Sequence, residues 1–144
     1  MATRPFFTTP QEAEAAFYDA LERADLDAMM GVWAEDEEIV CIHPGGTRLV
    51  GVAAVRDSWR QIFLQARKMQ VRCSGGIHTE GLLLAVSWVM EQFYLPGETR
   101  NYPPVAATNV FHKDSDGWRM LSHHASPVPA QQESSEDDGP RILH

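Results

Sequence analysis

The chain of 144 residues has few cysteines, few basic residues and no long apolar run, and each shortage excludes a class of protein. Two cysteines, Cys41 and Cys73, without a CxxC pair do not make a disulfide scaffold, so we expect two reduced thiols. Lys and Arg number 12 against 20 Asp and Glu, and the net charge of -8 disfavours binding to nucleic acid or to anionic membranes. The longest apolar run, residues 82–90, is interrupted by Ser87 and is too short to span a bilayer.

Several motifs that mark particular sites or locations are also missing. The six histidines show no HxH, HxxxH or HExxH spacing, and no Gly-rich loop resembles a phosphate-binding loop, so we expect neither a metal nor another cofactor. Residues 1–10 contain no apolar segment or cleavage signature of a secretion signal, which makes the cytoplasm the expected location. Residues 130–144 are acidic and lack apolar anchors, so we expect a disordered tail there.

The first half of the chain carries the helix signals. Residues 9–12 match a capping box with Pro10 at the first helical position, and apolar residues at helical spacing continue to Ala24. Asp25 is positioned to cap a second, short helix. A third helix begins near Gly51, with apolar residues every three or four positions.

The second half carries the strand signals, because the apolar period changes from about 3.6 to two. After a short early strand at 39–42, we predict strands at 69–73, 82–95, 106–113 and 118–125, the last two joined by a loop at 114–117. Helices followed by strands predict an α+β fold, in which three N-terminal helices pack on a curved antiparallel sheet and enclose an apolar pocket.

Several short motifs in this order make the chain similar to the NTF2-like superfamily, and specifically to its SnoaL-like branch. They are residues 24–30 (ADLDAMM), 33–36 (WAED), 43–46 (HPGG), 49–56 (LVGVAAVR), 116–119 (DGWR) and 123–127 (HHASP). The chain also resembles the association domain of calmodulin-dependent kinases and ketosteroid isomerase-like proteins.

The resemblance covers residues 10–129 and leaves residues 1–9 as an N-terminal extension and 130–144 as the tail. It implies a cystatin/NTF2-like cone with a pocket between the helices and the sheet, assembled as a homodimer across the sheet. The superfamily includes isomerases, dehydratases, cyclases, epoxide hydrolases, transport adaptors and assembly domains, so the activity has to follow from the site.

The ketosteroid isomerase pattern differs from this chain at each of its three chemical positions. Phe17 occupies the position of its tyrosine, with Tyr18 one residue away. His43, before Pro44, occupies the position of its carboxylate base, and Asn109 that of its protonated acid. His43 could still accept a proton near neutral pH, and Asn109 could polarise a carbonyl. The structural alternative is that His43 braces the turn at residues 44–46.

Two adjacent histidines in the last strand must point to opposite faces of the sheet. Pairing this strand with its neighbour around the loop at 114–117 predicts that Asn109, Ser122 and His124 share the pocket face, with His123 on the outer face. The candidate catalytic residues are therefore His43, Asn109 and His124. A hydrogen-bonded structural histidine is the alternative at both strand positions.

Aromatic residues supply the expected walls of the pocket, and the same side chains also suit a packed core. The candidate ligand-binding residues are Phe17, Tyr18, Trp33, Trp59, Trp88 and Ser122.

Two functional hypotheses follow from these residues. The first is a pocket protein for a small, mostly apolar, carbonyl-bearing ligand, with isomerase, dehydratase or cyclase acid–base chemistry. The alternative is a noncatalytic oligomerisation or association module, because every carboxylate that the isomerase pattern needs is replaced.

Overall fold

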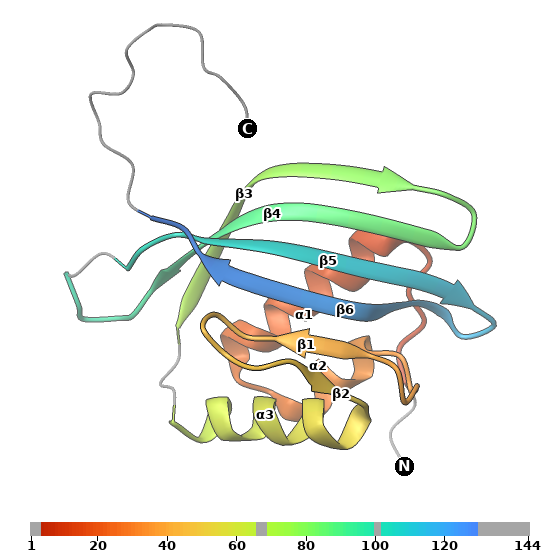
Figure 1. Cartoon of the computed structure of the whole chain (residues 1–144), viewed down its shortest axis with the longest axis horizontal. Coiled ribbons are helices and arrows are strands. Elements are labelled where there is room, and N and C mark those ends of the chain that lie inside the picture. Colours follow the sequence, from red (N-terminus) through yellow and green to blue (C-terminus); the bar gives the residue numbers. More distant parts are fainter. Residues whose placement is uncertain (1–3, 66–68, 100–101, 130–144) are drawn as a thin grey trace, which may run out of the picture.

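Three helices lie on one side of a curved sheet (Figure 1). The computed structural model describes residues 4–65, 69–99 and 102–129. In chain order the elements are α1 (Pro10–Arg23), α2 (Leu26–Val32), β1 (Val40–Ile42), β2 (Leu49–Val50), α3 (Val52–Gln65), β3 (Gln70–Glu80), β4 (Leu84–Tyr94), β5 (Val105–Asp114) and β6 (Gly117–Pro127). The architecture is the expected α+β fold.

Local side-chain chemistry sets the boundaries of the first two helices. The Thr9 hydroxyl accepts a hydrogen bond from the backbone N–H of Glu12 at 3.1 Å. The Asp25 carboxylate accepts one from the N–H of Ala28 at 3.0 Å and so caps α2. Between the helices Ala24 adopts a left-handed conformation with φ 53°, which ends α1. Both predicted caps are confirmed, because a cap needs only neighbouring residues.

The six strands form one sheet in the order β2-β1-β6-β5-β4-β3. All neighbouring pairs are antiparallel except β1 and β6, which run parallel. The parallel direction is already set before β1 begins, since Trp33 forms a parallel bridge with Met120 of β6. The expectation of a wholly antiparallel sheet is therefore wrong at this one pair, which brings Cys41 beside His123.

A bulge in β6 shifts the pairing of the last hairpin by one residue. Near the turn Phe111 is the partner of Met120, whereas the next pair joins Val110 to Ser122. Leu121 is therefore an extra residue on β6. Because side chains alternate between the two faces of a strand, one extra residue exchanges the faces for the rest of β6.

The bulge overturns the predicted assignment of faces. Asn109 is the partner of His123, and both side chains are buried on the helix side of the sheet. His124 is exposed and lies on the outer face, with the half-buried Ser122 two residues before it. The prediction that Ser122 and His124 share the inner face with Asn109 is wrong, because it assumed an unbroken register from the turn.

The edge strand β3 is longer than predicted and contains two adjacent glycines, Gly75 and Gly76. The register between β3 and β4 shifts between Ser74 and Ile77, and Gly75 has a φ of 63°. Gly75 and Gly76 therefore form a bulge within the strand. A bulge in an edge strand hinders its pairing with the edge of another sheet.

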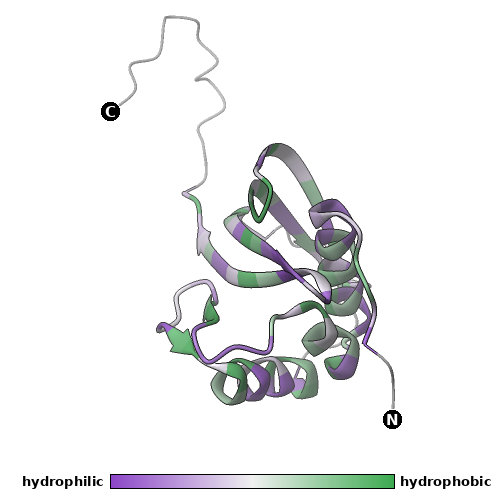
Figure 2. Ribbon diagram, turned by 90° about the vertical axis from the view of Figure 1, so that its right-hand side faces the viewer, coloured by the Kyte–Doolittle hydropathy of each residue, from purple (hydrophilic) through white to green (hydrophobic). Residues whose placement is uncertain are grey.

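Three of the four tryptophans are buried as expected, and the fourth is not. Trp33, Trp59 and Trp118 belong to the apolar core between the helices and the sheet. Trp88 is 42% exposed and lies on the outer face of β4, because the inward positions of this strand are occupied by Ala85, Ser87, Val89 and Glu91. The predicted burial of Trp88 is wrong. Figure 2 shows the same alternation of polar and apolar residues along the strands.

The described residues before α1 pack against the domain. Phe7 is buried and forms a bridge with Gly117 at the start of β6. Gly117 has a φ of 92°, and a Cβ at this position would lie 2.7 Å from the carbonyl oxygen of Phe7. Arg4 reaches the end of α2, where it donates to the carbonyl oxygen of Trp33. The predicted acidic tail, residues 130–144, lies outside the described residues.

Replacement of the α1 cap tests how much this local contact stabilises the domain. Thr9→Ala removes the acceptor of the Glu12 N–H, and we expect the free energy of unfolding to fall by about 1 kcal/mol. Urea denaturation measures the change. Thr47→Ala, the same substitution in the exposed loop between β1 and β2, is the control and should cost less than about 0.5 kcal/mol. Equal losses would show that the cap is not the cause.

Candidate functional site

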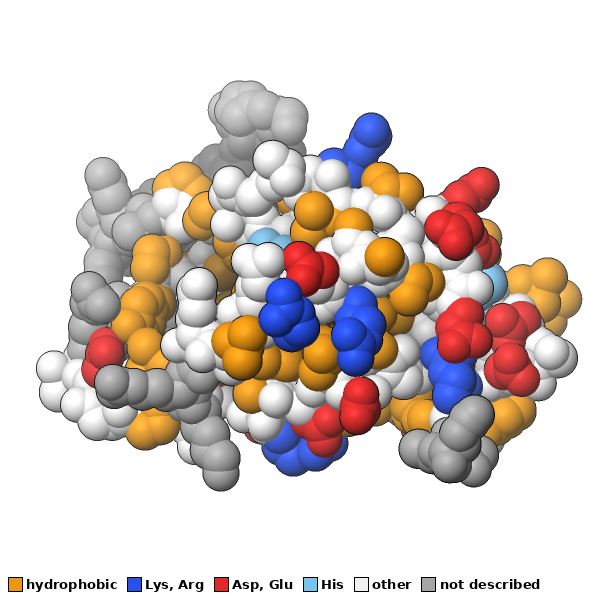
Figure 3. All heavy atoms as spheres, turned by 90° about the horizontal axis from the view of Figure 1, so that it is seen from below, with side chains coloured by type: hydrophobic (Ala, Val, Ile, Leu, Met, Phe, Trp, Pro, Cys, Tyr) orange, Lys and Arg blue, Asp and Glu red, His pale blue; other side chains and the backbone are white. Residues whose placement is uncertain are grey.

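A hollow of about 770 Å³ opens where α3 and β6 end and β4 leads into β5. Its lining is mostly apolar: Pro44, Met69, Phe93, Leu95, Pro96, Pro103, Val105 and Pro127, with Gln65, Glu98 and Tyr102 as polar members. We call this space the terminal hollow. Seen from the α3 side, apolar side chains gather at this end of the molecule, and charges of both signs are spread over the rest of that face (Figure 3).

A buried hydrogen-bond network centred on Asn109 joins α1 to the sheet. The Asn109 Nδ2 group donates to Glu14 Oε2 at 2.8 Å and to the Tyr18 hydroxyl at 3.0 Å. Asn109 Oδ1 lies 2.6 Å from His123 Nδ1. Tyr18 in turn donates to Glu91 Oε2 at 2.5 Å. One amide therefore connects two residues of α1 with residues of β4, β5 and β6.

The donors and acceptors of this network determine the tautomer of His123. Both amide hydrogens of Asn109 point to oxygen atoms, so Asn109 Oδ1 has to accept from His123, which places a hydrogen on its Nδ1. Burial, followed by repulsion between a protonated His123 and the neighbouring imidazoles of His43 and His124, lowers the pKa of His123 to about 3. The ring is thus neutral at physiological pH, and its Nε2 carries the lone pair.

The Glu91 carboxyl group is buried, and no cationic side chain among the described residues pairs with it. Its side chain is 2% exposed, and burial raises its pKa to about 7, with a further contribution from the charge of Glu14 and an opposing one from the hydrogen bond of Tyr18. Burial and the adjacent Glu91 raise the pKa of the Tyr18 phenol, so Tyr18 stays protonated and acts as a donor. Glu91 can therefore take up or release a proton near neutral pH while Tyr18 remains its hydrogen-bond donor.

The network adjoins two residues that line the terminal hollow, although none of its own members is a lining residue. Val105 lines the hollow and is the register partner of Glu91 across β4 and β5. Phe93 also lines it and follows Glu91 by two residues, which places both side chains on the same face about 7 Å apart. The carboxyl group of Glu91 therefore lies on the same sheet face as two lining residues and next to them.

Aromatic rings fill the middle of the space between the helices and the sheet. Trp59 contacts Phe17 and His43 edge-on, with ring centroids 5.6 and 4.7 Å apart. Phe17 also lies 4.8 Å from His123 and 4.9 Å from Tyr18. The open space is consequently at the end of the domain and not at its centre.

His43 points toward α3 and is partly buried. Its Nε2 lies 3.0 Å from the Ser58 hydroxyl, which itself donates to the carbonyl oxygen of Val55. Ser58 is therefore an acceptor for His43, and Nδ1 of the ring remains available. Burial lowers the pKa of His43, so the ring is neutral at physiological pH. The next residue, Pro44, forms part of the wall of the terminal hollow.

The structure brings together only part of the predicted site. Asn109, Phe17 and Tyr18 lie in or against the buried network, and His43 and Trp59 lie next to it. Trp33 is a core residue that forms a bridge with β6. Trp88, Ser122 and His124 lie on the outer face of the sheet, away from the hollow.

Sequence reasoning missed Glu14, Glu91 and His123. A signal for Glu91 was present, because it is the single charged residue in the predicted strand at 82–95. Glu14 and Tyr18 are four residues apart on α1, a spacing that places two side chains on the same face of a helix. No comparable signal existed for His123, since its face depends on the bulge at Leu121.

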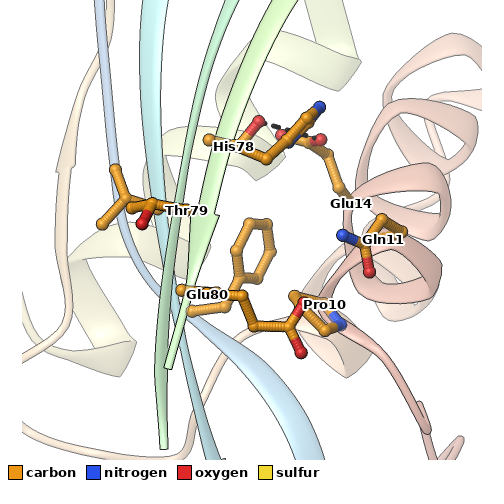
Figure 4. Close-up of a pocket in the computed structure, with 10 residues that line it drawn as sticks. Pro10, Gln11, Glu14, His78, Thr79 and Glu80 are labelled. Carbon is orange, nitrogen blue, oxygen red and sulfur yellow. Dashed lines mark hydrogen bonds between the residues drawn. The ribbon is translucent and has the colours of Figure 1, made fainter. Parts of the chain in front are cut away.

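A second, much smaller void lies beside the N-terminal part of α1. It has a volume of about 10 Å³, room for a single water molecule, between α1 and the strands β3 and β4. Figure 4 shows Glu14 and Gln11 of α1 facing His78 and Glu80 of β3, with the hydrogen bond from Ser87 to Glu14 dashed. Within the described part of the chain, no three His, Cys, Asp or Glu side chains are arranged to hold a metal ion.

Comparison with known proteins assigns the family. The family model described as the SnoaL-like domain matches residues 11–131, which is most of the chain. The chain belongs to the SnoaL-like family. None of the helices in the described residues is both long enough and apolar enough to cross a membrane.

Solved structures similar to this SnoaL-like domain carry different functional names. A candidate calcium/calmodulin-dependent protein kinase type II association domain from Thiobacillus denitrificans is 42% identical, with a TM-score of 0.79 over 87% of this chain and 99% of that one. A candidate dehydratase of the NTF2-like family from Streptomyces avermitilis is 31% identical, with a TM-score of 0.75 over 84% of this chain and 94% of that one. The NTF2-like fold is confirmed, and the function has to follow from the site.

A plant relative is longer than this chain. The F-box protein SKIP8 of Arabidopsis thaliana is 28% identical over 112 residues, which are 76% of this chain and 46% of that protein. The SnoaL-like domain thus spans less than half of this relative.

The burial of Glu91 should make the stability of the domain depend on pH. The pKa of Glu91 is raised in the folded state from 4.5 to about 7, so its contribution to stability is complete below pH 4.5 and is lost as the pH rises through 7. Glu91→Gln removes this dependence. Between pH 5 and pH 8, the free energy of unfolding of the original protein should fall relative to the variant by on the order of 3 kcal/mol.

Urea denaturation of both proteins at the two pH values measures this difference. A difference that stays constant between pH 5 and pH 8 would contradict the assignment of a buried, protonated carboxyl group to Glu91.

Proposed function

We propose that this SnoaL-like domain binds a small, mostly apolar ligand in the terminal hollow. The observation that carries the proposal is an apolar space of about 770 Å³ that ends beside a buried network of polar side chains. Pockets for small molecules usually have volumes of about 300–1,000 Å³, with apolar walls and a few polar groups that orient the ligand. The walls would bury the body of the ligand, and the Glu91 side would receive its polar group.

The catalytic form of this proposal is acid–base chemistry of the isomerase, dehydratase or cyclase kind on a carbonyl-bearing ligand. The acid–base groups would be His43, which precedes the lining residue Pro44, and the pair of Tyr18 and Glu91. Asn109 would position this pair, because both of its amide hydrogens are already used. His124 lies on the outer face of the sheet and has no part in this form of the proposal.

A charge placed in the wall of the hollow tests the site. N-phenyl-1-naphthylamine is a neutral apolar fluorophore whose emission rises when it leaves water, and we expect saturable binding at micromolar concentrations. Leu95→Asp, in the wall, should weaken binding about tenfold or more, because an apolar ligand would desolvate the new carboxylate. Leu83→Asp is the matched control on the exposed β3–β4 connection and should leave the affinity unchanged.

Two results of this titration would count against the terminal hollow. One is the absence of saturable binding to the original protein. The other is an equal loss of affinity in both variants, which would locate the bound dye elsewhere.

The second candidate function is self-association across the outer face of the sheet, and a separate observation favours it. Ile77, Leu84 and Trp88 are 65%, 55% and 42% exposed, and they lie with the half-buried Val86 and Met90 on the outer face of β3 and β4. Exposed apolar groups of this kind mark contact surfaces. A homodimer would cover them, and the 42% identical relative carries the name of an association domain. Such a dimer is compatible with an occupied hollow.

Substitution of the exposed tryptophan tests this surface. Trp88→Glu places a charge at the centre of the outer face, and we expect a homodimer to dissociate to monomers in sedimentation velocity experiments at micromolar protein concentration. Leu64→Glu is the control, because Leu64 is 73% exposed on α3 and away from the sheet surface. A monomeric original protein, or a Trp88→Glu variant that remains dimeric, would exclude this interface.

A further inference from the structure

The fold does not need a charged residue at position 91. A carboxyl group that is 2% exposed loses its hydration, which costs several kcal/mol per ion unless a cation or several donors compensate. The charged or titratable groups that face Glu91 are Glu14 and Tyr18 of α1, together with Cys73, its register partner on β3. Partial burial beside Glu91 and Glu14 raises the pKa of the Cys73 thiol to about 12, so this neighbour is neutral. None of these groups supplies a positive charge.

The hydrogen bonds of the network leave one carboxylate oxygen unused. Glu14 accepts from Ser87 with Oε1 and from Asn109 with Oε2. Tyr18 accepts from Asn109 and donates to Oε2 of Glu91. Among the contacts between described residues, Oε1 of Glu91 accepts no hydrogen bond. This oxygen can therefore accept a hydrogen bond from a donor that reaches it.

The unused oxygen belongs to a side chain next to the open space. Glu91 is the register partner of Val105 and shares the inner face of β4 with Phe93, and both of these residues line the terminal hollow. A flat apolar molecule seated against Val105 and Phe93 would therefore have its inner edge beside the Glu91 carboxyl group. The ligand group that suits this position is a hydrogen-bond donor.

We infer that the Glu91 carboxylate, positioned by Tyr18, accepts the proton of a weakly acidic hydroxyl group of the ligand, such as a phenol or an enol. This inference rests on the proposed binding of an apolar ligand in the terminal hollow and specifies the polar group of that ligand. In the step, the ligand O–H bond breaks, the proton binds an oxygen of Glu91, and the electron pair stays on the ligand oxygen. No further reactant is needed.

Two naphthalene probes distinguish the contribution of a hydroxyl group to binding from that of the apolar ring system. 2-Naphthol and 2-methoxynaphthalene have the same ring system, but only the first can donate a hydrogen bond. Excited 2-naphthol is a strong acid, so an adjacent proton acceptor produces the emission of the naphtholate ion at longer wavelength. Fluorescence titrations at pH 8 give the affinity of each probe and show whether the bound hydroxyl group meets a base.

The original protein should bind 2-naphthol about tenfold more tightly than 2-methoxynaphthalene, since a hydrogen bond to a charged group contributes about 1.5–3 kcal/mol. Bound 2-naphthol should also show naphtholate emission. Glu91→Gln should keep its affinity for 2-methoxynaphthalene and lose both the tenfold preference and the naphtholate emission. Glu22→Gln, a control on the same helix face as Tyr18, should retain both, because Glu22 contacts the backbone N–H of Val71.

Tyr18→Phe provides a second test that does not remove the carboxyl group. The hydrogen bond from Tyr18 lowers the pKa of Glu91, so its loss should raise that pKa. The naphthol preference requires ionised Glu91, and its midpoint in a pH titration should therefore move to higher pH in this variant. A structural role of Tyr18 alone would leave the midpoint unchanged.

The outcomes separate this inference from the function on which it rests. Equal affinity of the original protein for the two probes, or a preference that persists in Glu91→Gln, would overturn the role of Glu91 and leave apolar binding intact. Failure of both probes to bind would reject the terminal hollow as a ligand site together with the inference.

Discussion

The buried amide of Asn109 is the contact on which the arrangement of α1 and the sheet around the hollow depends. It donates two hydrogen bonds to α1 and accepts one from β6, so a single side chain connects the hairpin of β5 and β6 with a helix that is distant in sequence. An amide suits this position because it supplies donors and an acceptor without a charge. An aspartate here would place a carboxylate against Glu14 and close to Glu91, and a leucine would leave several buried polar groups without partners.

The same amide also determines the chemical state of its neighbours. Its oxygen places a hydrogen on Nδ1 of His123, and its N–H holds the Tyr18 hydroxyl so that the phenol donates to Glu91. Asn109 thus positions the pair of Tyr18 and Glu91 relative to the sheet, although it is not a member of that pair. The sequence comparison with ketosteroid isomerases considered Asn109 as a donor to a ligand, whereas in the structure both of its amide hydrogens have partners within the protein.

The features of the fold that could be predicted are those set by neighbouring residues, and the others depend on distant contacts. Thr9, Asp25 and the glycine-containing loop before β6 are read correctly, since caps and turns need only a few adjacent side chains. The face of His123 could not be predicted, because Leu121 is inserted into a pairing between two strands and leaves no trace in the alternation pattern. Trp88 misled for a related reason: apolar residues occur on both faces of β4, and the sequence pattern alone does not distinguish an apolar face that is exposed from one that is buried.

The interior of this SnoaL-like domain has two parts: packed aromatic rings, which stabilise the fold, and the terminal hollow, which is the proposed binding site. Phe17 and Trp59 occupy the centre, where a ligand would otherwise lie, and the hollow that remains is at the end of the helix layer. The rings exclude water from one side of the network, while the hollow approaches it at Glu91. A purely structural network would use glutamine at this position, because a neutral amide can accept from Tyr18 without the cost of a buried charge. The titratable group next to the lining residues Val105 and Phe93 is therefore the basis of the role proposed for Glu91.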